Sequence, residues 1–267
     1  IHYFLREENN LRLIIGGDSK IGSAIANHWT SKGHNIHYST RNKNLVSSER
    51  PFLNLKRVGV FDFTKYQKII VCSAQTNLSE CELFPRESQK INVDSVAQIL
   101  EMSSASDQVI LLSTNQVFDG AKPYRRIDDA KKPLNSYGKQ KSQMEDLALL
   151  HHNSCILRLS KVITPMDNLT NDWIKNLELG RNIEVFDDFF MSPTPIKKVL
   201  SKIDKLILNN SKGIFHCEGA EDISYYSFAK EIAKSQNLDT SLIKPISYLS
   251  SNKIKYRVPK YTSLLEG

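Results

Sequence analysis

The sequence predicts an α/β fold in which a Rossmann-type, doubly wound parallel sheet is joined to a smaller, mixed C-terminal lobe. Three observations predict it. Short β-rich runs alternate with amphipathic helical patterns, which is typical of a sheet with helices on both faces. Runs such as Val109–Leu112 are apolar throughout, as expected of a strand covered on both sides. A glycine-rich turn joins the first strand to the first helix.

The strand-like runs define the first part of the chain. We expect strands at 11–15, 35–39, 55–60, 68–73, 108–113 and 154–160. Helices are expected between them, since Ile21, Ile25 and Trp29 recur every fourth residue. After about residue 160, prolines and helical patterns dominate, and strand-like runs are restricted to 183–186 and 213–217. We therefore predict a nucleotide-binding domain at 1–160 and a substrate-binding lobe at 161–267, interleaved with the first.

Composition indicates a soluble protein of the cytoplasm. Of the 267 residues, 40% are hydrophobic and 24% charged, no apolar run is long enough to cross a membrane, and the first residues do not resemble a secretory signal. The four scattered cysteines favour buried thiols over a metal site or disulfides. The net charge of +7 suits a solvated surface or an anionic small ligand; Arg125-Arg126 and Lys131-Lys132 are candidates for a basic patch. No nucleic-acid-binding motif accompanies them.

The glycine-rich turn is the first candidate site. Gly16-Gly17-Asp18-Ser19-Lys20-Ile21-Gly22 follows a predicted strand and opens a helix. Such a turn lets backbone N–H groups and the helix N-terminus approach a pyrophosphate, although a glycine cluster is also a common tight turn. The cofactor-binding residues expected from it are Gly16, Gly17, Ser19, Lys20, Ile21 and Gly22.

The end of the second predicted strand bears on coenzyme choice. A site that prefers NAD usually has an acidic residue there, on the ribose hydroxyl. This chain has Thr40 and Arg41 instead, which suit a 2′-phosphate and favour NADP, with NAD still possible. Asp62, followed by Phe63, comes after the third predicted strand; it could bind the adenine amino group or simply cap a turn. We include both residues among the candidates for cofactor binding.

Tyr137 and Lys141 form the second candidate site. They lie four residues apart on one face of a predicted helix. A phenol has a pKa near about 10 and is a poor acid or base at neutral pH, but a neighbouring cation favours the phenolate. Many solvated helices carry the same pair, so its weight comes from the other motifs. Upstream, the apolar run at 109–112 ends in Ser113-Thr114.

Together these motifs resemble the extended short-chain dehydrogenase/reductase family, and within it the branch of dTDP-4-dehydrorhamnose reductase and related sugar-nucleotide reductases. The resemblance covers most of the chain in the right order. It is carried by the glycine-rich turn, Ile91–Asp94, Ser113–Gly120, Ser136–Lys141, Phe186–Asp188, Ser192–Thr194, Gly213–His216 and Arg257–Lys260.

The resemblance implies a role for each matching residue. Tyr137 would exchange a proton with the substrate oxygen, Lys141 would lower the pKa of Tyr137 and hold the nicotinamide ribose, and Thr114 would hydrogen-bond the reacting oxygen. Thr114, Gln116 and Tyr137 would contact the substrate. The backbone at Ser73 and Ala74 would run beside the bound cofactor. Asn92 would brace the site or be an ordinary helix residue. The implied reaction is NADP-dependent reduction of a keto-sugar, and the resemblance leads us to expect a sugar linked to a nucleotide.

The chain departs from the family pattern at three positions. Ser19 replaces the middle glycine of the turn, where a Cβ would crowd a pyrophosphate, and Asn115 and Gln116 replace an Asp and a Tyr of the branch. The related dehydratases need an Asp-Glu pair at those two places. Dehydration is therefore not expected. Two alternatives stay open: a non-catalytic, nucleotide-binding regulatory subunit, and an epimerase that retains NAD. The helical faces also leave a homodimer open. We expect neither a nucleic-acid nor a membrane partner. We expect His216, in an apolar strand, to be a core residue.

Overall fold

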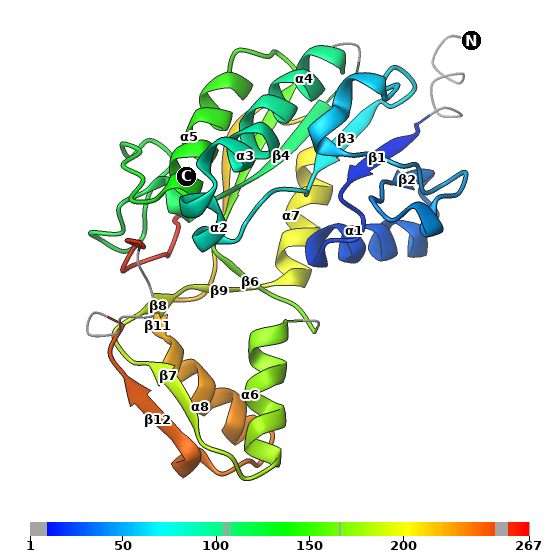
Figure 1. Ribbon diagram of the computed structural model, residues 1–267. Helices are drawn as coiled ribbons and strands as arrows, with labels where there is room; N and C mark the ends of the chain where they lie inside the picture. Colours follow the sequence, from blue (N-terminus) through cyan, green and yellow to red (C-terminus); the bar gives the residue numbers. More distant parts are fainter. Residues whose placement is uncertain (1–9, 104–105, 107, 166, 249–255, 267) are drawn as a thin grey trace.

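The computed structural model describes residues 10–248 and 256–266, except 104, 105, 107 and 166. Its centre is a six-stranded parallel sheet with the strand order β10-β5-β4-β3-β1-β2 (Figure 1). The strands are β1 (Arg12–Ile15), β2 (Ile36–Tyr38), β3 (Lys68–Val71), β4 (Gln108–Thr114), β5 (Ser154–Leu159) and β10 (Gly213–Cys217). The α/β, doubly wound fold class is confirmed.

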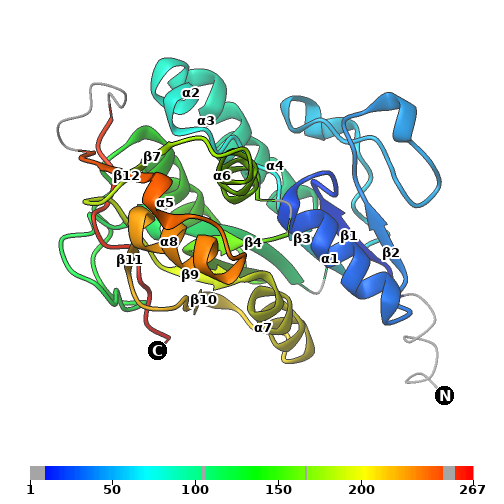
Figure 2. The ribbon, with the colours of Figure 1, turned by 90° about the horizontal axis from the view of Figure 1, so that it is seen from below.

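Helices cover both faces of this sheet because successive strand residues point to opposite sides. Leu13 and Ile15 pack with helices α4 (Ser95–Met102) and α5 (Ser136–Ala148). Ile14 packs with α1 (Lys20–Ser31) and α7 (Ile196–Leu208). Figures 1 and 2 show α4 and α7 on opposite sides of the strands. Three short helices precede α4 without a long break: α2 (Leu78–Leu83), α3 (Pro85–Gln89) and a π-helical turn, η4 (Lys90–Asp94).

The strand predicted at 55–60 is wrong. Leu55–Val60 instead forms short 3₁₀ turns, η3, with a kink at Arg57. The side chain of Asn54 caps the first turn by accepting a hydrogen bond from the Lys56 N–H, and Leu55 and Val58 are buried against one face of the sheet. The sixth strand is β10, which lies beyond residue 160, so α7 and β10 complete the large sheet from the second half of the chain.

The small lobe has its own core, in which Trp173, Ile183 and Ala229 are buried together. Its elements are α6 (Asn168–Glu178), β7 (Ile183–Phe186), β8 (Phe190–Met191), β11 (Ile223–Ser224), α8 (Tyr225–Ser235) and β12 (Ile243–Ile246). Strands β7 and β12 pair in parallel, and β8 and β11 pair antiparallel. Between the lobes, β6 (Lys161–Ile163) pairs with β9 (Pro193–Pro195) (Figure 1). Short 3₁₀ turns are η2 (Lys43–Leu45), η5 (Asn115–Val117) and η6 (Thr240–Leu242).

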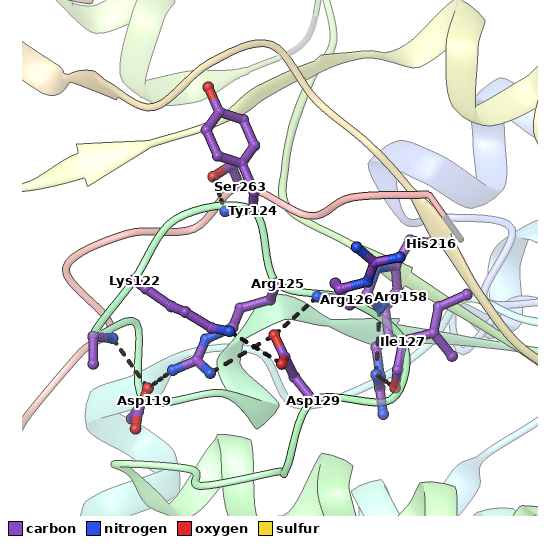
Figure 3. Close-up of polar contacts among 11 residues, drawn as sticks. Asp119, Lys122, Tyr124, Arg125, Arg126, Ile127, Asp129, Arg158, His216 and Ser263 are labelled. Atoms are coloured by element: carbon purple, nitrogen blue, oxygen red, sulfur yellow. Dashed lines mark hydrogen bonds and ion pairs between the residues drawn. The ribbon is translucent and has the colours of Figure 1, made fainter.

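The last residues of the chain lie against the loop that follows η5 (Figure 3). The Arg125 N–H donates to the Ser263 carbonyl at 3.0 Å, and the Leu265 N–H donates to the Arg125 carbonyl at 2.8 Å. The Arg125 guanidinium is paired with Asp119 and lies 3.8 Å from Asp129. The charge of Arg125, a candidate for a basic patch, is therefore compensated by two carboxylates of its own loop.

His216 is fully buried in β10, where burial lowers its pKa to about 4 and its Nδ1 lies 2.8 Å from the Leu265 carbonyl. The prediction of a core histidine is confirmed.

Among the residues described, none of the helices is both long enough and apolar enough to cross a bilayer.

Candidate active site

The glycine-rich turn after β1 is closed on itself and on its neighbours. Gly16 has a φ of +91°, in the region that favours glycine, and a Cβ there would lie 2.7 Å from the Ser73 Cβ. A Cβ on Gly22 would overlap the Gly16 carbonyl oxygen. Both glycines are thus required by the fold of the turn. This holds whether or not a ligand is bound.

Ser19 fits this turn as the N-cap of α1. Its Oγ accepts a hydrogen bond from the Gly22 N–H at 3.0 Å and donates to the Gly16 carbonyl at 2.8 Å. Serine is a preferred N-cap residue because its hydroxyl satisfies a free N–H of the first turn. The departure from the family pattern at Ser19 therefore stabilises the turn, and its hydroxyl is engaged there.

A cavity of about 220 Å³ opens beside this turn, and we call it the nucleotide cavity. It contains six of the predicted cofactor-binding residues: Gly16, Ser19, Thr40, Arg41, Ser73 and Ala74. It also contains residues that the sequence reasoning did not select, which are Ile15, Asp18, Ser39, Leu53, Leu55, Cys72 and Thr76. Most of these flank a predicted residue in the chain. Leu55 belongs to the segment wrongly predicted as strand, and Leu53 lies two residues before it.

Other predicted cofactor residues lie elsewhere. Gly17 packs against Tyr38 and is not part of the cavity wall. Lys20 and Gly22 are also absent from the described lining. Asp62 is exposed, and its carboxylate accepts hydrogen bonds from the Thr64 N–H and hydroxyl at 2.9 and 2.6 Å. Phe63 is 1% exposed in the core. Asp62 therefore caps a turn, as the alternative interpretation expected. It does not line the nucleotide cavity.

A second cavity, of about 310 Å³, contains all three predicted catalytic residues, and we call it the carbonyl cavity. Thr114 comes from the end of β4, and Tyr137 and Lys141 come from the first turns of α5. Ile21 lies in the same wall. The carbonyl cavity shares Cys72, Ser73, Ala74 and Thr76 with the nucleotide cavity. The two cavities therefore meet at the segment that follows β3.

Lys141 is buried and held in place. Its side chain donates a hydrogen bond to the Leu112 carbonyl at 2.6 Å, and the residue is 5% exposed. Burial lowers the pKa of Lys141 to about 8, and the nearby Glu145 carboxylate opposes this shift. The ammonium is thus close to its titration range at neutral pH.

The pKa of Tyr137 differs in direction from the prediction. We expected Lys141 to lower it, but in this structure burial raises the pKa of Tyr137 well above the usual value of a phenol, and the charge of Cys81 acts in the same direction. The physical reason is desolvation of the phenolate, which outweighs the influence of a lysine already bonded to a backbone carbonyl. Tyr137 is therefore protonated at neutral pH.

Thr114 and Gln116 have different surroundings. The Thr114 Oγ1 accepts a hydrogen bond from the Gln116 N–H at 3.2 Å and caps η5, with the side chain in the carbonyl cavity. The Gln116 side chain accepts a hydrogen bond from Asn135 at 2.9 Å and is not among the residues that line this cavity. Thr114 thus lies with Tyr137 in the wall of this cavity, and Gln116 does not.

Asn92 braces the loop between the two cavities. Its amide donates to the Gln75 carbonyl at 2.9 Å and to the Gln140 side chain at 2.8 Å, and its oxygen accepts from the Gln75 N–H. Asn92 is 1% exposed and lies in the π-helical turn η4. Since Gln75 follows Ser73 and Ala74 and Gln140 precedes Lys141, the observed bonds agree with the bracing interpretation.

Behind the carbonyl cavity lies a buried ion pair. The Arg158 guanidinium binds Glu145 through two hydrogen bonds of 3.0 and 2.8 Å, and these side chains are 1% and 0% exposed. Ser113 donates to the same carboxylate at 2.6 Å. Arg158 does not line the cavity, whereas Lys161 does, 3.4 Å from the carboxylate of Asp167.

Comparison with known proteins agrees with this architecture. The family model of the RmlD substrate binding domain matches residues 11–266. Methionine adenosyltransferase 2 subunit beta of Bos taurus is 28% identical over 262 residues, which covers 90% of this chain and 76% of that protein. A dTDP-4-dehydrorhamnose reductase of Sinorhizobium fredii is 30% identical over 175 residues, which covers 61% of this chain and 59% of that protein.

Solved structures share the fold. A hypothetical dTDP-4-dehydrorhamnose reductase from Sulfolobus tokodaii has a TM-score of 0.83 at 26% identity, covering 95% of this chain and 91% of that one. The dTDP-4-dehydrorhamnose reductase of Bacillus anthracis, solved in complex with NADP, has a TM-score of 0.84 at 21% identity, covering 97% and 91%. The predicted resemblance is confirmed, and the chain belongs to the family described as the RmlD substrate binding domain.

Proposed function

We propose that this protein is an NADP-dependent reductase of a keto-sugar linked to a nucleotide. One observation carries the proposal. Thr114, Tyr137 and Lys141 line one cavity, and that cavity shares Ser73 and Ala74 with the nucleotide cavity. A coenzyme spanning the two would meet a substrate carbonyl beside the phenol. The reductases among the relatives, and the NADP complex of one structural neighbour, support the choice of reaction and coenzyme.

Each cavity would bind a different part of the coenzyme and substrate. The glycine-rich turn would hold the pyrophosphate through its N–H groups and the N-terminus of α1. Arg41, an exposed residue in the wall of the nucleotide cavity, would face the 2′-phosphate. The bound coenzyme supplies the hydride to the carbonyl carbon. We assign sugar binding to the lobe after residue 160, because Lys161 and Val162 reach the carbonyl cavity.

Proton transfer would complete the reaction. The carbonyl oxygen gains negative charge as its carbon accepts the hydride, so it needs a hydrogen-bond donor and then a proton. Thr114 would donate the hydrogen bond, and Tyr137 would donate the proton, leaving a phenolate. A phenol whose pKa is raised is fully protonated before the reaction. The Lys141 ammonium would stabilise the phenolate until solvent returns the proton.

Two measurements on the purified chain test this proposal. NADPH and NADH binding should be detectable by calorimetry and by coenzyme fluorescence. NADPH oxidation should then depend on a substrate from a panel of keto-sugar nucleotides, with the reduced sugar identified by mass spectrometry. A folded protein that binds neither coenzyme would contradict the proposal at its first step. One that binds NADPH without turning over any member of the panel would contradict the catalytic assignment.

A second function is a non-catalytic subunit of a methionine adenosyltransferase. It is favoured by the extent of the matches: relatives named methionine adenosyltransferase 2 subunit beta match up to 90% of the chain, whereas the named reductases match 61% and 77%. The test is co-elution of the chain with a methionine adenosyltransferase catalytic subunit, with and without NADP. A stable complex combined with no reductase turnover would establish this second function in place of the first.

A further inference from the structure

The side chain of Asp18, a residue of the glycine-rich turn, lies beside Thr40, just after the end of β2. The glycine-rich turn is fastened to this strand by two hydrogen bonds: Gly17 N–H donates to the Ser39 carbonyl at 2.9 Å, and Gly16 N–H donates to the Ser39 Oγ at 3.0 Å. Asp18, the next residue of the turn, thereby lies opposite Thr40. It lines the nucleotide cavity together with Thr40 and Arg41.

The carboxylate of Asp18 is held by donors from two other segments. The Thr40 hydroxyl donates to Oδ2 at 2.6 Å, and the Arg50 guanidinium forms an ion pair with Oδ1. Partial burial alone would raise the pKa of Asp18, but the hydrogen bonds from Thr40 and Arg50 outweigh it and lower the pKa. The side chain is still 40% exposed, so an ionised carboxylate faces the cavity.

This arrangement changes what a 2′-phosphate would meet. The Thr40 hydroxyl already donates to Asp18, and the charge of Arg50, which also lies over the Tyr38 ring, is compensated by the same carboxylate. Arg41 is exposed in the same cavity wall. A phosphate with close to two negative charges would stand near a carboxylate, whereas a ribose hydroxyl would find an acceptor. Sites that favour NAD use an acid at the end of the second strand in this way.

We propose that Asp18 determines the coenzyme selectivity of this site. Its carboxylate accepts a hydrogen bond from the ribose 2′-hydroxyl of NAD(H) and repels the 2′-phosphate of NADP(H), so it limits the preference for NADP(H) that Arg41 provides to less than about tenfold. The inference rests on the proposed binding of a nicotinamide dinucleotide. It deepens that proposal by naming the residue that sets the coenzyme preference. Asp18 belongs to the glycine-rich turn, whereas the acidic residue of an NAD site normally follows the second strand.

The test compares dissociation constants of NADPH and NADH, by calorimetry, in the wild type and in three variants. Asp18→Asn keeps the size of the side chain and an acceptor for Thr40 but removes the charge. We expect the ratio Kd(NADH)/Kd(NADPH) to rise about tenfold in this variant. Arg41→Ala should lower the ratio. Asp239→Asn, at an exposed turn of the small lobe, is the matched control and should leave it unchanged.

The outcomes separate the two proposals. A rise of less than about threefold in Asp18→Asn, in a protein that binds both coenzymes, overturns the role of Asp18 and leaves the proposed function standing. A folded wild type that binds neither coenzyme overturns both. If Asp18→Asn does not fold, the wild type still decides: 5′-ADP and 2′,5′-ADP should bind with affinities within about tenfold, and a larger preference for 2′,5′-ADP overturns the inference.

Discussion

The nucleotide cavity and the carbonyl cavity share four residues after β3, yet they are built in opposite ways. The nucleotide cavity lies beside the closed glycine-rich turn, and the charge of Asp18 in its wall is paired with Arg50 near solvent. The carbonyl cavity has side chains from β4, α5 and the start of β6 in its wall, and of its titratable groups Lys141 is buried and Tyr137 half-buried.

This difference predicts which kind of substitution should impair each cavity. Steric change should damage the nucleotide cavity, because its glycines leave no space for a Cβ. Change of charge or protonation should damage the carbonyl cavity, because burial shifts the pKa of Tyr137 upward and that of Lys141 downward, so the neutral form of each is favoured. Four substitutions or conditions test this division, in order of expected effect.

The largest effect is expected from Tyr137→Phe, which removes the proposed proton donor and leaves the ring. Loss of a general acid costs about 100- to 10,000-fold in rate, so kcat should fall by that factor while the dissociation constant of NADPH changes little. Steady-state kinetics and calorimetry measure the two quantities. Tyr124→Phe, at a tyrosine that is 45% exposed, is the control and should keep full activity. A Tyr137→Phe variant with normal kcat would remove Tyr137 from the reaction.

The next effect concerns the ion pair behind the carbonyl cavity. Glu145→Ala leaves the fully buried Arg158 guanidinium without its carboxylate, and such a loss costs about 3–5 kcal/mol of unfolding free energy. Urea denaturation measures it. Glu231→Ala, on the exposed side of α8, should change stability by less than about 0.5 kcal/mol. Replacing both Glu145 and Arg158 with apolar residues should recover part of the loss. If Glu145→Ala proved as mild as its control, the buried pair would not stabilise this cavity.

Much of this architecture could be predicted from local pattern. The spacing of Tyr137 and Lys141 placed both on one side of a helix, and both line the carbonyl cavity. The direction of the Tyr137 pKa could not be predicted, because it depends on how deeply packing buries the phenol. The strand error at 55–60 has a similar origin. The segment contains Leu55, Val58 and Val60, apolar residues typical of a short strand, but capping by Asn54 and burial of Val58 favour 3₁₀ turns.

Long-range pairing accounts for the other misses. Asp18 was visible within the glycine-rich turn, but its partner Arg50 lies 32 residues later, in a segment without a regular pattern. Strand β10 was recognised as a strand, yet its place at the edge of the large sheet depends on pairing with β5 across an intervening lobe. No periodicity within a short window carries that information.

The nucleotide cavity should respond to Gly22→Ala. The new methyl group would overlap the Gly16 carbonyl oxygen, so the turn must shift. Overpacking of this kind costs about 1–3 kcal/mol, and NADPH affinity should fall with it. Gly59→Ala is the control, because a Cβ there meets no atom within 4 Å. Thermal unfolding and calorimetry give the two readouts. A Gly22→Ala protein with unchanged stability and NADPH affinity would show that the turn is not sterically closed.

The smallest effect is expected from pH, through Lys141. Its pKa falls from 10.5 in the unfolded chain to about 8 in the folded protein. Between these values the unfolded chain holds more protons, so unfolding free energy should rise with pH, by about 2 kcal/mol between about pH 8 and pH 10 for this group alone. Below about pH 8 both states carry the charge, and the burial cost is present in full.

Lys141→Met isolates this contribution, since methionine is of similar length and carries no charge. The difference in unfolding free energy between the wild type and Lys141→Met, followed by urea denaturation at each pH, should move in favour of the wild type above about pH 8. Lys205→Met, on the surface of α7, should give a difference that does not depend on pH in this window. A flat difference for Lys141→Met as well would mean that the ammonium is not desolvated. The carbonyl cavity would then resemble the nucleotide cavity, with its charges open to water.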